Sequence, residues 1–113
     1  MDHTITNDGD CVIVALHGDI DLQYSGHARE VLLQATDEAL SVVVGMSGVG
    51  MIIDSSGVAS LLEALQASRK RNRRFFLAAI DPSVDRVLML ARLETVFEIT
   101  DDVAAAKLSL AEN

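Results

Sequence analysis

The amino-acid sequence predicts a single α/β domain over residues 1–113, with a mostly parallel or mixed sheet of four to five strands and about four helices. Short apolar runs of strand length alternate with longer segments of helical periodicity along the chain. A tight-turn composition near the start predicts that the sheet opens with an antiparallel strand pair. Finally, no linker, repeat or low-complexity tract divides the chain into smaller units.

An N-terminal hairpin accounts for the first two predicted strands. Residues 4–6 are short and β-branched, residues 7–10 (NDGD) have the composition of a tight turn, and residues 11–17 are rich in Val, Ile and Leu. The helix that follows is predicted to start near Gln23, because apolar residues then recur at roughly helical spacing as far as Ala39.

The middle of the chain repeats the strand and helix pattern. Residues 41–46 (SVVVGM) form a continuous apolar run that is too short for a helix and typical of a strand covered on both faces. Residues 56–71 place apolar side chains on one face of a second helix. Residues 75–80 (FFLAAI) are the next buried strand, so an inner, parallel sheet is predicted.

The last third of the chain has clear helix-start signals. Asp81 stands as an N-cap acid before Pro82, which suits the first position of a third helix. A short strand is predicted at residues 96–99, and the acids at residues 101–102 are predicted to cap an Ala-rich helix that ends near Leu110.

Composition excludes several classes of function. The formal charge of -8 and the pI near 4.6 argue against a surface that binds nucleic-acid phosphates or anionic membrane. Cys11 is the only cysteine, so we expect neither disulfides nor a cysteine metal cluster, and no other ligand spacing predicts a metal or cofactor. With no secretory signal and no apolar run of membrane-spanning length, the sequence predicts a cytoplasmic protein without membrane insertion.

The candidate site is the stretch IIDSSG at residues 52–57, which places an acid and two hydroxyls where the second helix begins. In parallel sheets, functional groups collect at the carboxyl ends of the strands, and this stretch follows such a strand. Three roles compete for the serines: a helix cap, a catalytic nucleophile, or a hydroxyl that another enzyme modifies.

A catalytic serine is the weakest of these interpretations. Ile53 stands two residues before Ser55, so the strained G-x-S-x-G turn of many hydrolases is absent. The three histidines are His3 in a polar terminus, His17 at a strand end and His27 in the first helix, and none is a convincing base.

Two further motifs have simpler interpretations. Residues 45–50 (GMSGVG) lack the lysine and the spacing of a phosphate-binding loop, so we expect only a flexible glycine turn. Residues 69–74 (RKRNRR) end the second helix, where basic side chains complement the negative end of the helix dipole. A salt-dependent contact with a partner is the second interpretation of this basic cluster.

Helix capping explains part of the serine motif. Asp54, Ser55 and Ser56 fall at predicted cap positions, where short oxygen side chains accept hydrogen bonds from free backbone N–H groups. Capping needs one hydroxyl and leaves another at the N-terminus of the helix. A phosphate there would be favoured by the dipole and the unpaired amides, would be repelled by Asp54, and would present about two negative charges to a docked protein.

The order of motifs resembles the STAS domain of bacterial anti-sigma-factor antagonists. The resemblance rests on HGDID at residues 17–21, the VVV strand, DSSG at residues 54–57, and FFLAAIDPSVDRVLMLARLETVFEITDD at residues 75–102, and it spans nearly the whole chain. It implies the STAS fold and a protein that is a switch without catalytic activity of its own.

The resemblance also implies a mechanism and site residues. Members of this family bind an anti-sigma factor that is also a serine kinase, which frees the sigma factor. Phosphorylation with ATP releases the antagonist, and a phosphatase resets it. The acceptor position corresponds to Ser55, followed by Ser56 and Gly57, while Asp21 and Asp54 correspond to the kinase-facing surface.

The sequence departs from the family pattern beside the predicted acceptor. Gly45 stands where the family usually carries Asp or Asn, and one additional residue lies near Gly50. Asn72 replaces a frequent glycine before the fourth strand, and asparagine tolerates the left-handed conformation expected there. The alternative function is a STAS subunit of a larger assembly, such as a lipid transporter component, without phosphorylation. Binding of a small ligand is a third possibility.

Overall fold

The computed structural model describes residues 2–9, 11–18, 25–38, 41–49 and 55–111. The five strands are β1 (Asp2–Asp8), β2 (Cys11–His17), β3 (Ser41–Gly48), β4 (Arg74–Ala78) and β5 (Glu98–Thr100). The four helices are α1 (Ser25–Glu38), α2 (Ser55–Lys70), α3 (Pro82–Leu90) and α4 (Val103–Ala111). None of these helices is long and apolar enough to span a membrane.

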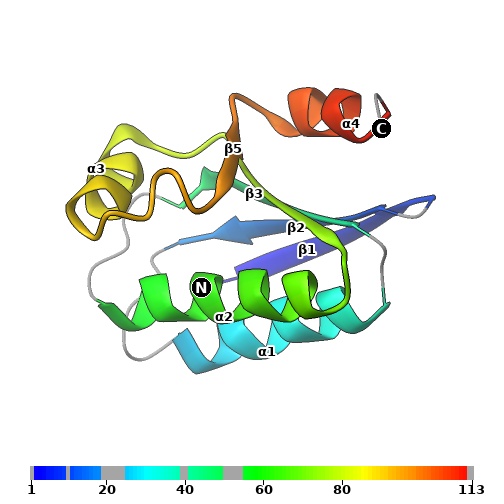
Figure 1. Ribbon diagram of the computed structural model, residues 1–113, viewed down its shortest axis with the longest axis horizontal. Coiled ribbons are helices and arrows are strands. Elements are labelled where there is room, and N and C mark those ends of the chain that lie inside the picture. Colours follow the sequence, from blue (N-terminus) through cyan, green and yellow to red (C-terminus); the bar gives the residue numbers. More distant parts are fainter. Residues whose placement is uncertain (1, 10, 19–24, 39–40, 50–54, 112–113) are drawn as a thin grey trace.

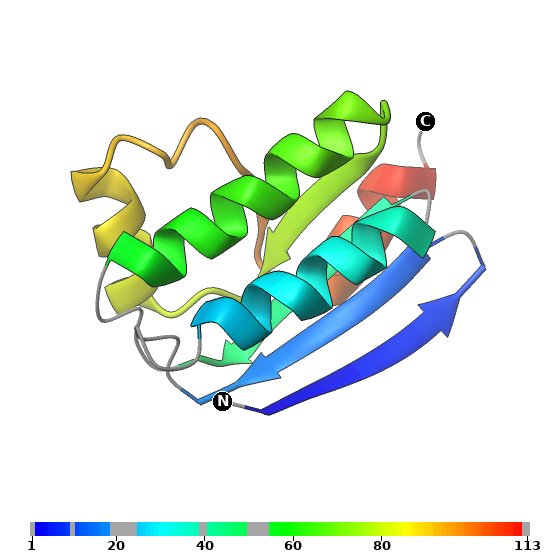
Figure 2. The same ribbon diagram turned by 90° about the horizontal axis from the view of Figure 1, so that it is seen from below.

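The strands form one mixed sheet in the order β1-β2-β3-β4-β5. β1 pairs with β2 antiparallel, and every later neighbour is parallel, which confirms the predicted hairpin and fold class. Helices α1 and α2 run side by side across one face, and α4 covers part of the other face (Figures 1 and 2). Each parallel crossover therefore connects two strands that are neighbours both in the sequence and in the sheet.

Alternation along β3 divides the core into two clusters. Val42, Val44 and Met46 belong to the larger cluster beneath α1, α2 and α3, while Val43 belongs to the smaller cluster under α4. All four side chains are at most 1 % exposed. A strand buried on both faces explains why residues 41–46 are apolar without alternation.

Four of the predicted strands have different bounds in the structure, and the first of them, β1, runs over Asp2–Asp8 instead of residues 4–6. β3 continues two residues beyond the predicted end, so the expectation of a flexible glycine turn is wrong for residues 45–48. β4 starts at Arg74 and ends at Ala78, and β5 lies at Glu98–Thr100 instead of residues 96–99. The apolar pattern that predicted a strand at residues 96–99 includes Phe97, which lies just before β5. Its side chain is buried and packs against Phe75, with ring centroids 6.4 Å apart.

Two helices end in left-handed residues other than glycine. After α2, Asn72 has φ 56°, and the Arg73 N–H donates to the Ser68 carbonyl at 2.9 Å, as in a Schellman motif. The predicted left-handed Asn72 is thus confirmed. After α3, Arg92 has φ 59°, and the Leu93 N–H donates to the Leu88 carbonyl at 2.8 Å.

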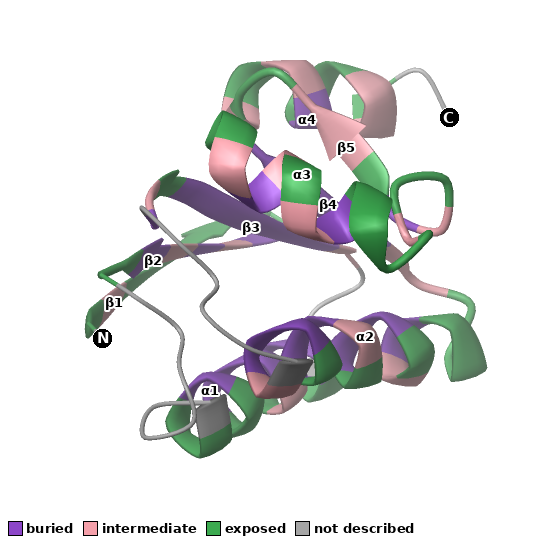
Figure 3. Ribbon diagram, turned by 90° about the vertical axis from the view of Figure 1, so that its left-hand side faces the viewer, coloured by how far each residue is buried: buried purple, intermediate pink, exposed green. Residues whose placement is uncertain are grey.

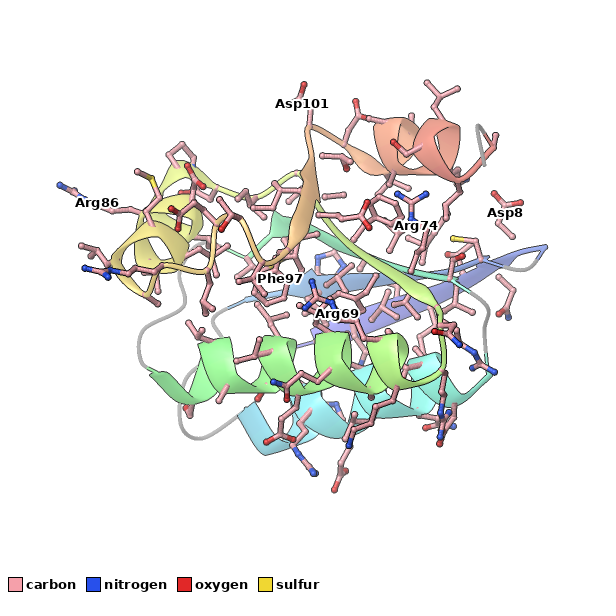
Figure 4. The ribbon with its side chains drawn as sticks, in the orientation of Figure 1. Asp8, Arg69, Arg74, Arg86, Phe97 and Asp101 are labelled. Carbon is pink, nitrogen blue, oxygen red and sulfur yellow. The ribbon has the colours of Figure 1, made fainter. Side chains whose placement is uncertain are left out.

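The basic cluster at residues 69–74 joins elements that are distant in the sequence. Arg69 donates to the Val96 carbonyl at 2.9 Å, and Arg74 pairs with Glu98 while it lies over the Phe76 ring (Figure 4). Arg71 and Arg73 both reach the C-terminal end of α1: Arg71 pairs with Asp37, and Arg73 donates to the Thr36 and Asp37 carbonyls. The dipole explanation holds only for Arg69 and Lys70, which lie in the last turn of α2.

Asp81 and Asp102 cap the helices that the sequence predicted. Asp81 Oδ1 accepts hydrogen bonds from the Ser83 N–H at 2.9 Å and the Ser83 hydroxyl at 2.7 Å. Asp102 Oδ1 accepts from the Ala105 N–H at 2.7 Å at the start of α4. Both helix starts therefore follow from local chemistry that can be recognised in the sequence.

The Asp81 cap predicts a loss of stability in acid. Hydrogen bonds from the Ser83 hydroxyl and N–H hold the pKa of the Asp81 carboxyl below its usual value. A lowered folded-state pKa adds stability above the ordinary carboxyl pKa, and this contribution disappears as the pH falls through the folded-state value. The advantage of the wild type over Asp81→Asn should therefore shrink between about pH 5 and pH 3. Urea unfolding at pH 7 and pH 3 tests this, and a constant difference would refute it.

Candidate functional site

The predicted acceptor begins a helix at the carboxyl edge of the sheet. Ser55, Ser56 and Gly57 form the first turn of α2, which follows β3 in the chain. Ser56 is half-buried and Gly57 is buried. The other two predicted site residues, Asp21 and Asp54, lie outside the described residues.

The start of α2 differs by one residue from the predicted start. Because the helix begins at Ser55, Ser56 lies inside its first turn. The Ser56 carbonyl accepts a hydrogen bond from the Ser60 hydroxyl at 3.0 Å. The two serines are therefore both residues of the first turn of α2.

The strand ends beside α2 are joined by a bulge. The pairing of Ala15 with Gly45 is followed by the pairing of His17 with Gly48, so β3 supplies one more residue than β2 between these points. The Gly18 N–H then donates to the Gly48 carbonyl at 2.8 Å, and Gly18 has φ 88°. The bulge brings the end of β2 close to the backbone of β3.

Gly48 is required by this close approach. A Cβ atom at Gly48 would collide with the His17 ring and would lie 2.9 Å from the Leu16 carbonyl oxygen. Backbone contacts of this kind cannot be relieved by turning a side chain. The glycine therefore fixes the path of β3 towards the loop that leads to Ser55.

Gly45 lies on the opposite face of the sheet from α2. It pairs with Ala15 and Ala78 in the interior of β3, and a Cβ atom there would lie 3.6 Å from Val103 Cγ2 of α4. The family pattern places a carboxylate here and predicts that its replacement by Gly45 alters the surroundings of the acceptor. In the structure, a side chain at residue 45 would face α4, because residue 45 lies on the same face of β3 as Val43, which belongs to the cluster under α4.

The three histidines lie near this edge, although their positions in the sequence did not predict that they come together. His3 on β1 and His27 on α1 have ring centroids 5.4 Å apart, and His17 Nε2 lies 3.4 Å from the Thr4 hydroxyl. The hairpin register, which pairs His3 with Leu16, could have indicated the contact. These rings pack β1 against α1 and the strand end.

The described residues contain no metal-ligand group and no reactive thiol. No set of three or more His, Cys, Asp or Glu side chains in the described ranges could hold a metal ion. Cys11 is buried at the start of β2, and this burial raises the pKa of its thiol. A buried thiol that stays protonated is a poor nucleophile.

A separate pocket of about 310 Å³ lies at the carboxyl ends of β4 and β5. Its lining residues are Ile80, Pro82, Asp85, Ile99, Thr100 and Asp101. The sequence predicted the edge of the sheet as the place for a site but gave no signal for a hollow at these two strands. The pocket combines apolar walls with two carboxylates, and no basic side chain lines it.

Comparisons with known proteins agree with this architecture. The model of the STAS domain family matches residues 3–106. Among solved structures, a putative anti-sigma factor antagonist from Thermotoga maritima has 18% identity and a TM-score of 0.87, with 95% of this chain and 92% of that chain covered. A sulfate transporter family protein from Wolinella succinogenes has 19% identity and a TM-score of 0.79, with coverage of 96% and 93%.

The Bacillus antagonist SpoIIAA is similar in two forms. Its unphosphorylated form has 16% identity and a TM-score of 0.83, with 99% of this chain and 98% of that chain covered. Its phosphorylated form has 16% identity and a TM-score of 0.74, with coverage of 96% and 99%. At these identities the likeness establishes the shared fold.

Proposed function

Because the chain belongs to the STAS domain family, we propose that it is an anti-sigma-factor antagonist that acts by partner switching. It binds an anti-sigma factor with serine kinase activity, and phosphorylation of Ser55 by that kinase, with ATP, ends the binding. A phosphatase restores the unphosphorylated form. The protein itself is a binding protein and not an enzyme, and the switch operates in the cytoplasm.

The observation that carries this proposal is the position of Ser55 as the first residue of α2. The N-terminal end of a helix carries the positive end of the dipole, so a phosphate can be held there without disturbing the fold. The solved antagonist in unphosphorylated and phosphorylated forms supports the same kind of modification here.

Release follows from electrostatics. A phosphoserine adds about two negative charges at neutral pH. The protein already carries a formal charge of -8, and Asp21 and Asp54 are proposed to face the partner together with Ser55, Ser56 and Gly57. A partner surface that fits the unmodified serine would then lie against a new negative charge. That charge repels acidic groups of the partner or loses its water without compensation, and the complex would dissociate.

A labelling experiment tests the acceptor. Each anti-sigma factor kinase of the source organism is purified and mixed with the wild-type chain and ATP labelled at the γ-phosphate. We expect one kinase to label the wild type, and Ser55→Ala to lose all incorporation because the acceptor oxygen is gone.

Ser56→Ala is the matched control for this experiment. It removes the neighbouring hydroxyl in the same helical turn but keeps the acceptor oxygen of Ser55, so it should reach the same final incorporation of label with the same circular dichroism spectrum. Incorporation that persists in Ser55→Ala, or that disappears only in Ser56→Ala, would overturn the assignment of Ser55.

A second candidate function is that of a STAS subunit in a transporter, without phosphorylation, as in a lipid transporter component. The similarity to the sulfate transporter family protein favours it. In that case the chain would copurify with transporter subunits, genes for those subunits would lie beside its own, and Ser55→Ala would leave the assembly unchanged.

A further inference from the structure

Strand β1 presents a long free edge. It is an outer strand of the sheet, and none of the described strands pairs with the side that faces away from β2. Figure 2 shows β1 at the border of the sheet beyond α1, and Figure 3 shows most of it in the green of exposed residues. Such an edge invites pairing with another strand, because its outward N–H and C=O groups can serve as a template.

β1 lacks the features that usually protect an edge strand. Proteins keep such strands short, place Pro or Lys on them, or interrupt them with bulges. β1 has seven residues without Pro, Lys or Arg, and its register with β2 runs from Asp2 to Asp8 without a shift. The opposite edge of the sheet differs, because β5 has only three residues and begins with Glu98. The free side of β1 is therefore suited to pairing, and that of β5 is not.

The hydrogen bonds of β1 indicate which backbone groups face outward. In an antiparallel pair, successive residues direct their N–H and C=O groups alternately toward the partner strand and away from it. The His3 N–H donates to the Asp2 carboxylate at 2.8 Å and not to β2, so it lies on the free side. By the same alternation, the backbone groups of Ile5 and Asn7 face away from β2. The β1 edge, defined as the outward backbone groups of residues 3, 5 and 7, can therefore pair with another strand.

The sequence of β1 is nearly symmetric about Ile5. Residues 2–8 read DHTITND, with a threonine on each side of Ile5 and an acid at each end. Antiparallel pairing of two copies about this residue would place Ile5 opposite Ile5 and Thr4 opposite Thr6. It would also use all the outward groups of the β1 edge, in about six backbone hydrogen bonds. Cross-strand pairs of threonine and of β-branched side chains stabilise a sheet, and a two-fold contact of this kind closes as a dimer.

Lys107 removes the main obstacle to this register. Asp2 of one copy would lie opposite Asp8 of the other, and like charges directly opposite each other destabilise a strand pair. Asp8 Oδ2 is already paired with Lys107 Nζ of α4 at 2.7 Å, so Asp2 would meet an ion pair instead of a lone carboxylate. At the centre of the register, Ile5 is 50% exposed in the single chain and would be covered by its copy.

We propose that two copies of the chain associate through the β1 edge into a dimer with one continuous sheet. A second copy is the partner that this edge fits, because the register centred on Ile5 matches its backbone groups, its threonines and its charges. The edge runs along the side of the sheet, whereas Ser55 begins α2 at the carboxyl ends of the parallel strands. The dimer is therefore independent of the function proposed for Ser55.

Sedimentation equilibrium of the full chain measures this association. The small interface predicts a dissociation constant of about 10–500 μM. Ile5→Lys places two like charges opposite each other at the two-fold axis, so it should weaken the dimer about 30-fold or more. Met89→Lys is the matched control, because Met89 is 55% exposed on α3, away from β1, and it should keep the wild-type dissociation constant.

The results of this measurement decide the proposal. Loss of the dimer in Ile5→Lys alone, with an unchanged circular dichroism spectrum, supports pairing through the β1 edge. A wild type that stays monomeric up to about 1 mM overturns it. A dimer that persists in Ile5→Lys, or that Met89→Lys weakens equally, would also overturn it, because the contact would then lie elsewhere or depend on net charge.

Lys107→Ala tests the register without changing β1. Lys107 and Asp8 are both well exposed, so the loss of their ion pair should leave the fold intact. Asp8 would then face Asp2 of the other copy as a lone carboxylate, and the dimer should weaken about 3- to 10-fold. Adding Asp2→Asn removes this repulsion and should recover most of the lost affinity. Equal dissociation constants for the wild type and Lys107→Ala would overturn the register centred on Ile5.

Discussion

Ser55→Asp should lower the affinity for the anti-sigma factor about 30- to 150-fold, which corresponds to about 2–3 kcal/mol. The carboxylate places a permanent negative charge in the first turn of α2, where the phosphate would stand. The fold tolerates this charge because the helix dipole favours an acid in that turn. The partner, in contrast, loses a contact with a neutral hydroxyl and must desolvate a charge.

Ala104→Asp is the matched control for charge. Ala104 is exposed in the first turn of α4, which lies on the other face of the sheet, so the variant adds the same charge to the first turn of a different helix. Calorimetric titration should give wild-type affinity for Ala104→Asp. If Ser55→Asp binds the anti-sigma factor as tightly as the wild type and has an unchanged circular dichroism spectrum, Ser55 does not lie in the interface. Equal losses in both variants would reduce the effect to net charge.

Local chemistry made part of the fold predictable. The turn composition at residues 7–10 predicted the antiparallel β1-β2 pair, and the sequence Asp81-Pro82 predicted the start of α3. Asn72 could be assigned a left-handed conformation because asparagine adopts it more readily than most residues. In each case the information lies within a few neighbouring residues.

Contacts between distant segments were not predictable in the same way. The arginines at residues 69–74 suited a helix end, but nothing local indicates that Arg73 reaches the Asp37 carbonyl. The left-handed conformation of Arg92 has no sequence signal, because arginine does not favour it. Likewise, the crossover rule applies to a helix between two parallel strands, and α4 follows the last strand among the described residues. The rule therefore could not assign α4 to the face opposite α1 and α2.

The candidate site was predictable to a different degree. The DSSG motif marked the start of α2 to within one residue. The glycine-rich stretch before it was misread, because glycine signals a turn unless another strand approaches closely. The bulge between Ala15 and His17 creates such an approach, and it is a property of the pairing of β2 with β3 that residues 45–48 do not reveal alone.

Gly48→Ala should therefore destabilise the domain by about 2–4 kcal/mol, a large effect for a single methyl group. The new Cβ atom would meet the His17 ring and the Leu16 carbonyl oxygen, so the ends of β2 and β3 must separate. Since β3 leads into the loop before Ser55, the variant should also be a poorer substrate for the kinase. Urea unfolding and the initial rate of labelling measure the two effects.

Gly26→Ala and a double variant make this prediction specific. Gly26 is exposed in α1 with nothing within 4 Å of a new Cβ atom, so Gly26→Ala should stabilise the domain by up to about 1 kcal/mol. Adding His17→Ala to Gly48→Ala removes the ring but leaves the Leu16 carbonyl oxygen, so only part of the lost stability should return. If the double variant were as stable as His17→Ala alone, the clash with the His17 ring would be the whole reason for the glycine at residue 48. A Gly48→Ala variant as stable as the wild type would show that the strand ends are not held together by this close approach.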